Sequence, residues 1–239
     1  MQLFFSNNIN DNLITLDKVE SNHCLKVLRY NIGDKVHVVD GLNNYYEGII
    51  ASIENKICHV KIKKKIKAFD NRQCYVHIAI SPIKNQDRLE WFIEKTVEIG
   101  VDEISFINCN RTLRKNIRLE RIAKIAKSAM KQTLKATLPK INPMISFSDF
   151  VKNLNSDSNF ICHLEHTIKN DIFSYRSNIL ENKKVCILIG PEGDFSIKEV
   201  ENAYDKNVKP LSLGNSRLRT ETAGIVACHL SNLIMSIDG

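Results

Sequence analysis

The sequence predicts an α/β protein of two domains, a small β-rich domain over residues 1–70 and a larger α/β domain over residues 74–239. Length and composition support this division, because 239 residues with 43% hydrophobic side chains suit one large or two modest soluble globular domains. The pattern also changes after the polar linker at residues 69–73. Short strands separated by turns precede the linker, whereas strands alternate with helices after it, as in a parallel sheet.

The first domain is predicted to form a small barrel. Residues 2–5 make the first strand, and Asp17 followed by Glu20 resembles a capping pair that opens a helix through about Arg29. Turn signals at residues 31–34, 40–44 and 54–55 then separate strands at residues 35–39, 45–53 and 56–67. In the last strand Cys58, Val60 and Ile62 alternate with basic side chains, which predicts one apolar face and one basic face.

The second domain is predicted to contain a parallel sheet. Strands are expected at residues 75–81, 103–108, 159–164, 185–190 and 209–213. Helices are expected at residues 87–99, 118–137, 147–153, 168–180, 196–205 and 221–235. The continuous apolar run from Val185 to Ile189 is typical of a central strand that is covered on both faces.

The positive charge of the chain is concentrated in one segment. The net charge is +7, yet residues 111–140 hold ten basic side chains and one acid, Glu120, a local charge of +9. At 100° per residue, the five cations at positions 121, 124, 127, 131 and 135 share an arc of about 120° on the predicted helix. A solvated face is the ordinary explanation, but such faces usually carry Glu at i,i+4 spacing from Lys. We therefore favour a nucleic-acid contact, which binds phosphates without reading sequence.

Several classes of protein are excluded. No apolar stretch approaches the roughly 20 residues of a membrane helix, and the first residues do not have the build of a signal peptide, so a cytoplasmic protein without membrane contact is expected. The seven cysteines are scattered, which disfavours a disulfide framework and a zinc site, and the nearby Cys162, His163 and His166 are not expected to bind metal. Neither a dinucleotide-binding fingerprint nor a P-loop is present.

Scarce glycines mark a candidate pocket. Gly190, Gly193 and Gly214 are three of only nine glycines, and they follow two apolar strands, where ligands bind in open α/β sheets. Arg217 and Arg219 then precede the last helix and make an anion-binding corner. Simple turns and a capped helix remain the alternative explanation. Single side chains carry less weight. Trp91 is expected to pack against apolar neighbours, and His23 could contact phosphate or simply be a surface histidine.

These motifs together resemble the RsmE family of RNA methyltransferases, a member of the SPOUT class. The resemblance rests on Leu188 to Gly193, Leu211 to Gly214 and Leu218 to Ala223, with further matches at residues 23–29, 33–34, 88–101, 132 and 139. It implies methylation of uracil N3 in small-subunit (16S) ribosomal RNA, with S-adenosylmethionine as cofactor. It also implies a PUA-like barrel for the first domain, a SPOUT-type α/β fold with a C-terminal trefoil knot for the second, and a homodimer.

The resemblance also implies which residues do the work. A cofactor pocket would be lined by Leu164, Ile189, Gly190, Pro191, Glu192, Gly193, Leu213, Gly214, Leu218 and Arg219, with Glu165 as a weaker candidate. Arg219 is the first candidate to stabilise negative charge on the base, and Glu221 is an orienting partner or proton acceptor. Contacts with RNA are expected from His23, Lys26, Arg29, Arg111, Arg114, Arg121, Lys124, Lys127, Lys131 and Lys135.

Two departures from the family pattern affect the fine geometry. Asp194 stands where a second glycine is expected, and Lys131 and Lys135 stand where an acid and an arginine are usual. Two other functions stay open. One is a different SPOUT reaction such as ribose 2′-O methylation, and the other is a non-catalytic, ribosome-associated RNA-binding protein.

Overall fold

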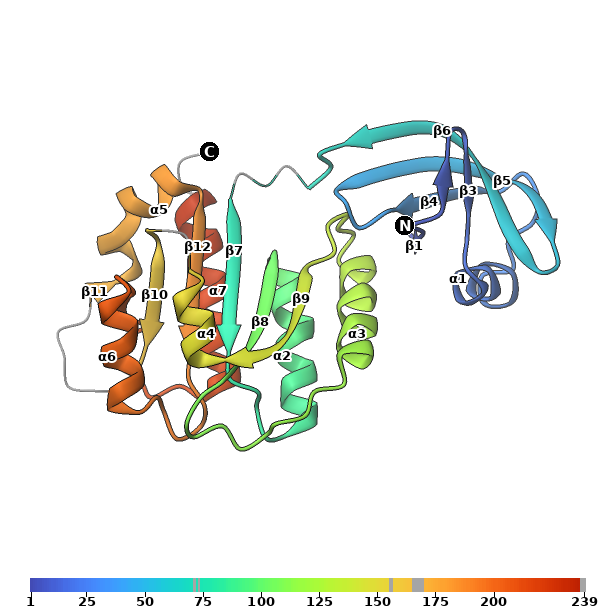
Figure 1. Ribbon diagram of the computed structural model, residues 1–239. Coiled ribbons are helices and arrows are strands. Elements are labelled where there is room, and N and C mark those ends of the chain that lie inside the picture. The colour runs from blue at the N-terminus through green and yellow to red at the C-terminus, as the bar shows by residue number, and fades with distance from the viewer. Residues whose placement is uncertain (71, 73, 155–156, 165–169, 237–239) are drawn as a thin grey trace. The chain divides into compact units, whose positions relative to one another are not determined.

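The computed structural model describes residues 1–239 except 71, 73, 155–156, 165–169 and 237–239, and it divides into two compact units (Figure 1). The N-terminal unit comprises Met1–Arg72 together with Lys127–Leu138. The C-terminal unit comprises Gln73–Ala126 and Pro139–Gly239. The border between the units therefore falls within helix α3 (Leu119–Gln132).

The N-terminal unit is built on a six-stranded sheet with the order β1-β4-β5-β6-β3-β2. Its strands are β1 (Leu3–Phe5), β2 (Ile9–Asn10), β3 (Leu13–Thr15), β4 (Lys35–Val39), β5 (Asn44–Glu54) and β6 (Ile57–Lys67). β1 and β4 run parallel and the other neighbours run antiparallel. Phe4, Ile14, Val38, Ile50 and Val60 are fully buried in its core, because the apolar positions of each strand face one side.

One helical segment lies against strand β6 of this sheet, and it is shorter than the sequence predicts. Asp17 caps α1 (Lys18–Asn22) by accepting a hydrogen bond from the Glu20 backbone, as expected, but α1 continues as a π-helix, η1 (His23–Val27). Arg29 then adopts a left-handed conformation, φ +59°, which ends the helical path. The short strands β2 and β3 were not predicted, because two and three residues give no readable alternation.

The C-terminal unit contains a parallel sheet with the order β11-β13-β10-β12-β7-β8-β9. Its strands are β7 (Tyr75–Ile80), β8 (Glu103–Asn108), β9 (Lys140–Ser146), β10 (Asn159–Cys162), β11 (Asn170–Asp171), β12 (Lys184–Ile189) and β13 (Lys209–Ser212). Its helices, besides α3, are α2 (Gln86–Ile99), α4 (Phe147–Lys152), the 3-10 turn η2 (Ile172–Tyr175), α5 (Arg176–Asn182), α6 (Ile197–Asp205) and α7 (Thr220–Ser236). The predicted α/β class is confirmed, and the trefoil knot stays a prediction.

Helices cover both faces of the parallel sheet, with α4 and α6 on the near face and α2 and α7 on the far face in Figure 1. Alternate side chains of the central strand β12 accordingly face opposite layers. Cys186 and Leu188 belong to the cluster formed with α4 and α6, and Val185, Ile187 and Ile189 are buried as well. The continuous apolar run therefore marks a strand covered on both faces, as predicted.

Two helix predictions are wrong in their extent. The helix expected over residues 118–137 ends at Gln132, because Leu134 adopts φ +57° and the backbone N–H groups of Ala136 and Thr137 bond to the Asp70 carboxylate. The helix expected over residues 168–180 is replaced, in the described residues, by β11, η2 and α5. Asp171 starts η2 by accepting a hydrogen bond from the Ser174 backbone.

A buried polar network joins β7, β8 and β9 away from the strand ends that carry the glycines. His77 Nε2 lies 2.8 Å from Ser105 Oγ, and His77 Nδ1 lies 3.8 Å from Glu103 Oε2. Glu103 also accepts hydrogen bonds from Tyr75, Asn142 and Lys140. Burial lowers the pKa of His77 to about 4. Burial alone would raise the pKa of Glu103, but the His77 charge and the three hydrogen bonds outweigh it and hold that pKa at about 2.

Candidate functional site

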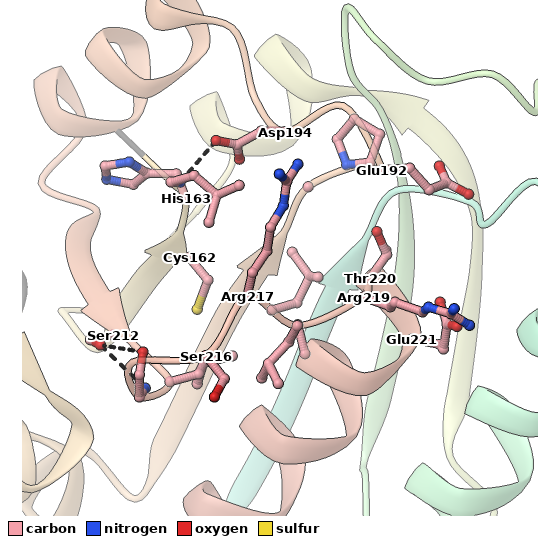
Figure 2. Close-up of a pocket in the computed structure, with 18 of the residues that line it drawn as sticks. Cys162, His163, Glu192, Asp194, Ser212, Ser216, Arg217, Arg219, Thr220 and Glu221 are labelled. Carbon is pink, nitrogen blue, oxygen red and sulfur yellow. Dashed lines mark hydrogen bonds between the residues drawn. The ribbon is translucent and has the colours of Figure 1, made fainter. Parts of the chain in front are cut away.

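A cavity of about 580 Å³ opens at the carboxyl ends of the parallel strands in the C-terminal unit (Figure 2). Its wall comes from the segments that follow β10, β12 and β13, from the start of α7 and from Arg88 of α2. Parallel strands end at one edge of a sheet, so loops that are distant in sequence meet there. The volume lies in the range of about 300–1,000 Å³ that is typical of small-molecule pockets.

Side chains of the loop that follows β12 bond to neighbouring loops. The Glu192 carboxylate accepts a hydrogen bond of 2.9 Å from the Lys84 backbone N–H, beyond the end of β7. The Asp194 carboxylate accepts one of 2.8 Å from the Leu164 backbone N–H, beyond β10 (Figure 2). Asp194 also adopts φ +65°, a conformation that glycine tolerates better. The departure from the family pattern therefore costs some backbone strain and gains a bond between two pocket walls.

Two of the pocket glycines are required by close contacts or backbone conformation. A Cβ on Gly190 would lie 3.0 Å from a ring carbon of Phe195, which is fully buried. Gly214 adopts φ +112°, which side chains rarely allow. The pocket wall is thus bare backbone at Gly190 and Gly214, where a ligand can approach main-chain N–H and C=O groups.

The two predicted catalytic residues lie at the start of α7 and both line the cavity. Glu221 is buried, and its carboxylate lies 3.6 Å from the guanidinium of Arg88. Arg219 is exposed. Arg88 was missed as a pocket residue by sequence reasoning. The available signal was its place near the start of the helix that directly follows β7.

The structure brings the predicted cofactor residues together, with one difference. Leu164, Ile189, Gly190, Pro191, Glu192, Leu213, Gly214, Leu218 and Arg219 all line the cavity. Gly193 does not; it lies against the side chain of Arg111. Glu165, like His166, falls outside the described residues. Asn215 and Ser216, which follow Gly214 and were expected in the same wall, line the cavity as well. Sequence reasoning missed Cys162, His163 and Ser212 as lining residues. Contact of any of these residues with a cofactor stays a prediction.

Several predicted RNA-binding cations have partners within the protein. Arg121 forms two hydrogen bonds with Glu90 of α2 and holds the pKa of that carboxyl below its usual value. Lys131 is paired with the buried Glu20, and Lys127 lies 4.1 Å from the ring centre of Phe5. Glu120 is the one acid within residues 111–140, but acids from α1 and α2 also approach this face.

The other predicted RNA contacts differ in whether their side chains already bond to protein groups. Arg111 and Arg114 bond to protein groups, Arg111 to the loop after β12 and Arg114 to Gln86 and to the Asn116 carbonyl. Lys26, Arg29 and Lys124 are exposed, whereas His23 and Lys135 are half-buried. Trp91, which was expected to pack, is 45% exposed, so that prediction is wrong.

The described residues contain no group of three or more His, Cys, Asp or Glu side chains that could hold a metal ion. Within the same described ranges, no helix is both long and apolar enough to cross a membrane.

Comparison with known proteins fits both units. Residues 70–232 match the model of an RNA methyltransferase domain, and residues 16–63 match that of an RNA methyltransferase PUA domain. The ribosomal RNA small subunit methyltransferase E of Mesomycoplasma hyopneumoniae is 30% identical over 94% of this chain and 96% of its own. The chain belongs to the ribosomal RNA small subunit methyltransferase E family. The sequence-based assignment to RsmE is thereby confirmed, as is the PUA-like nature of the first domain.

Solved structures agree with this family assignment. A probable rRNA-methyltransferase from Porphyromonas gingivalis is 35% identical, covers 100% of both chains and superposes with a TM-score of 0.91. An RsmE from Neisseria gonorrhoeae, described as bound to S-adenosyl methionine, shares the fold at 22% identity with a TM-score of 0.85, covering 98% of both chains.

Proposed function

We propose that this RsmE protein transfers the methyl group of S-adenosylmethionine to N3 of a uridine in 16S ribosomal RNA. The observation that carries the proposal is the convergence of a glycine-lined cavity with Arg219, Glu221 and Arg88 at one edge of the sheet. The relatives named above supply the reaction class, and the RsmE family resemblance supplies the position on the base.

The cavity fits such a cofactor. The absence of side chains at Gly190 and Gly214 leaves backbone amides and carbonyls accessible to a nucleoside, and apolar Ile189, Leu213 and Leu218 offer a surface for its base. The RsmE of Neisseria gonorrhoeae, whose structure is described with S-adenosyl methionine, supports the same choice. When bound, the cofactor supplies an electrophilic methyl group on a cationic sulfur.

The side chains at the start of α7 then act on the uracil. N3 must lose its proton as it takes the methyl group, and Glu221 is the proposed acceptor of that proton. Arg88 lies 3.6 Å from the Glu221 carboxylate and orients it from the side of α2. Arg219, which is exposed and lines the cavity, stabilises the negative charge that develops on the ring. Holding the two reactants in line supplies much of the remaining acceleration.

The N-terminal unit is the proposed RNA-binding part of the protein. Residues 1–72 and 127–138 contain 14 basic and 8 acidic side chains, a net charge of +6, whereas the C-terminal unit has 20 and 19, a net charge of +1. The match of residues 16–63 to a PUA domain of RNA methyltransferases supports the same role. Exposed lysines and arginines of this unit would contact phosphates without reading the sequence.

A homodimer in the cytoplasm completes the proposal. Helix α7 is mostly apolar, and Ile225, Val226, Leu230, Leu233 and Met235 are only half-buried within the chain. A helix with that composition is usually fully covered, so a second copy is the proposed cover. Light scattering during gel filtration should give about twice the 27.3 kDa mass of one chain.

Analysis of modified nucleosides tests the reaction. Small-subunit RNA from a strain that lacks the gene should lose 3-methyluridine and regain it when the wild-type gene is returned, but not when the Glu221→Gln form is returned. Undiminished 3-methyluridine in the deletion strain would refute the proposal. Loss of a 2′-O-methyl nucleoside would instead assign a different SPOUT reaction, and no S-adenosylmethionine binding in calorimetry would favour a non-catalytic RNA-binding protein.

A further inference from the structure

The loop from Gly190 to Phe195 is attached to three neighbouring loops, each at the end of a different parallel strand. Two attachments, at Glu192 and Asp194, use side chains of the loop itself. The third comes from outside: Arg111, beyond the end of β8, donates hydrogen bonds of 2.6 Å to the Gly193 carbonyl and 3.4 Å to the Phe195 carbonyl. Arg111 thus fixes two main-chain carbonyls of the loop whose first residues form one wall of the cavity.

The stem of Arg111 also explains Gly193. A Cβ on Gly193 would lie 3.3 Å from Cδ and 3.5 Å from Cβ of Arg111, so the arginine packs across the bare backbone there. Gly193 does not itself line the cavity. Its lack of a side chain therefore serves the approach of Arg111, rather than direct contact with a ligand.

The turn that carries Arg111 is firmly held. Thr112 is buried, accepts a hydrogen bond of 2.8 Å from the Cys109 backbone N–H, and lies 2.8 Å from the Ser81 hydroxyl. The Asn110 backbone N–H donates to the Glu199 carboxylate, which also caps α6. The backbone on both sides of Arg111 is therefore fixed, and the exposed Arg111 side chain reaches the loop from a defined starting point.

We infer that Arg111 is a positioning residue for the cofactor-binding loop and not an RNA contact, which is the role that the sequence suggested for it. The inference rests on the proposed function, since it assigns S-adenosylmethionine to the cavity. Both hydrogen bonds come from one guanidinium nitrogen, Nη1, whose two hydrogens lie in the plane of the group, whereas a lysine ammonium keeps the charge and loses that planar geometry. Charge and geometry can thus be separated by substitution.

Arg111→Lys and Arg111→Gln test the inference, with Lys115→Gln as the matched control from the same exposed segment. Calorimetry with S-adenosylmethionine should show Kd raised about tenfold or more in both Arg111 variants and unchanged in the control. RNA affinity of Arg111→Lys should equal that of the wild type at both low and moderate salt. If the variants bind S-adenosylmethionine like the wild type, and Arg111→Gln instead weakens RNA binding with a smaller salt slope, Arg111 is an RNA contact and the inference fails.

A double-mutant cycle separates positioning from general loss of structure. Gly193→Ala should weaken S-adenosylmethionine binding in the wild type, because its methyl group displaces the arginine stem. In the Arg111→Ala background the same change should have no further effect, and additive losses would overturn the inference. Failure of the wild-type protein to bind S-adenosylmethionine would refute the proposed function itself, which is a different result from equal binding by all variants.

Discussion

Lys131 of α3 donates a hydrogen bond to the buried carboxylate of Glu20 of α1, across 111 positions of sequence. The Glu20 side chain is only 4% exposed. Its second oxygen, Oε2, is buried without a hydrogen-bond partner in the part of the chain that the structure describes. Lys131 therefore balances a charge that water does not reach, and this ion pair attaches the end of α3 to the N-terminal unit.

Removing Lys131 should destabilise the N-terminal unit. Lys131→Met leaves the Glu20 charge buried and unpaired, which costs about 3–5 kcal/mol of unfolding free energy. Lys124→Met, on the exposed part of the same helix, should change it by less than about 0.5 kcal/mol. Urea unfolding followed by circular dichroism measures both. Adding Glu20→Gln to Lys131→Met should restore part of the loss, and equal stability of the two lysine variants would contradict the role given to the pair.

The same residues show what the sequence can and cannot predict. Most strands of the parallel sheet, and the loops that carry Gly190 and Gly214, follow from local apolar runs and turn residues. The edge of the sheet at which the cavity lies could therefore be predicted from the sequence. The partners of Lys131 and Arg121 could not, because Glu20 and Glu90 reach them only through tertiary folding. Strand β9 was missed for a local reason: it is a half-exposed edge strand that contains Pro143, a residue that weakens any strand pattern.

Gly190→Val should abolish cofactor binding while leaving RNA affinity intact. The added side chain meets the buried Phe195 ring at about the closest approach that a Cβ tolerates, so the loop after β12 must move. Gly190→Ala, with a smaller displacement, should give an intermediate Kd for S-adenosylmethionine in calorimetry. A Gly190→Val protein that binds the cofactor normally would show that this loop does not form the cofactor wall.

Asp194→Ala should raise the KM for S-adenosylmethionine several-fold, because the Leu164 backbone N–H loses its acceptor and the wall after β10 is released. Asp194→Asn is the matched control. Asparagine keeps an oxygen at the same place and tolerates positive φ, so its KM should stay within about twofold of the wild type. Steady-state kinetics at saturating RNA decide the matter. An asparagine variant as impaired as the alanine variant would mean that the charge of Asp194 matters and not its hydrogen bond.

Glu221→Gln should lower kcat by about 10²–10⁴-fold with little change in the Kd for S-adenosylmethionine, as expected for the loss of a proton acceptor. Arg88→Gln should also lower kcat, by about tenfold, since it acts on the reaction through Glu221. Asp87, which is exposed and directly precedes Arg88, provides the control: Asp87→Asn should change neither kcat nor the Kd for S-adenosylmethionine. Single-turnover methyl transfer to small-subunit RNA measures the step itself, and full activity in Glu221→Gln would remove Glu221 from the chemistry.

The buried network of His77 and Glu103 should make the C-terminal unit less stable in acid. The folded-state pKa of His77, about 4, lies below its ordinary value of 6.5, so the unfolded chain binds the proton more readily. Stability is therefore complete above pH 6.5 and falls as the pH drops from 6.5 to about 4. The pKa of Glu103 is lowered as well, to about 2, so its contribution is present above its ordinary value of 4.5 and is lost as the pH falls toward 2.

The slope between about pH 6.5 and 5.5 reports mainly His77, because Glu103, with an ordinary pKa of 4.5, stays about nine-tenths or more ionised there in both states. Trp91 is the single tryptophan and lies in the C-terminal unit, so its fluorescence reports urea unfolding of that unit alone. His77→Gln, which keeps an amide near Ser105, should flatten the slope, whereas His229→Gln, at an exposed position on α7, should leave it unchanged. A slope that survives His77→Gln would place the acid-sensitive group elsewhere in the unit.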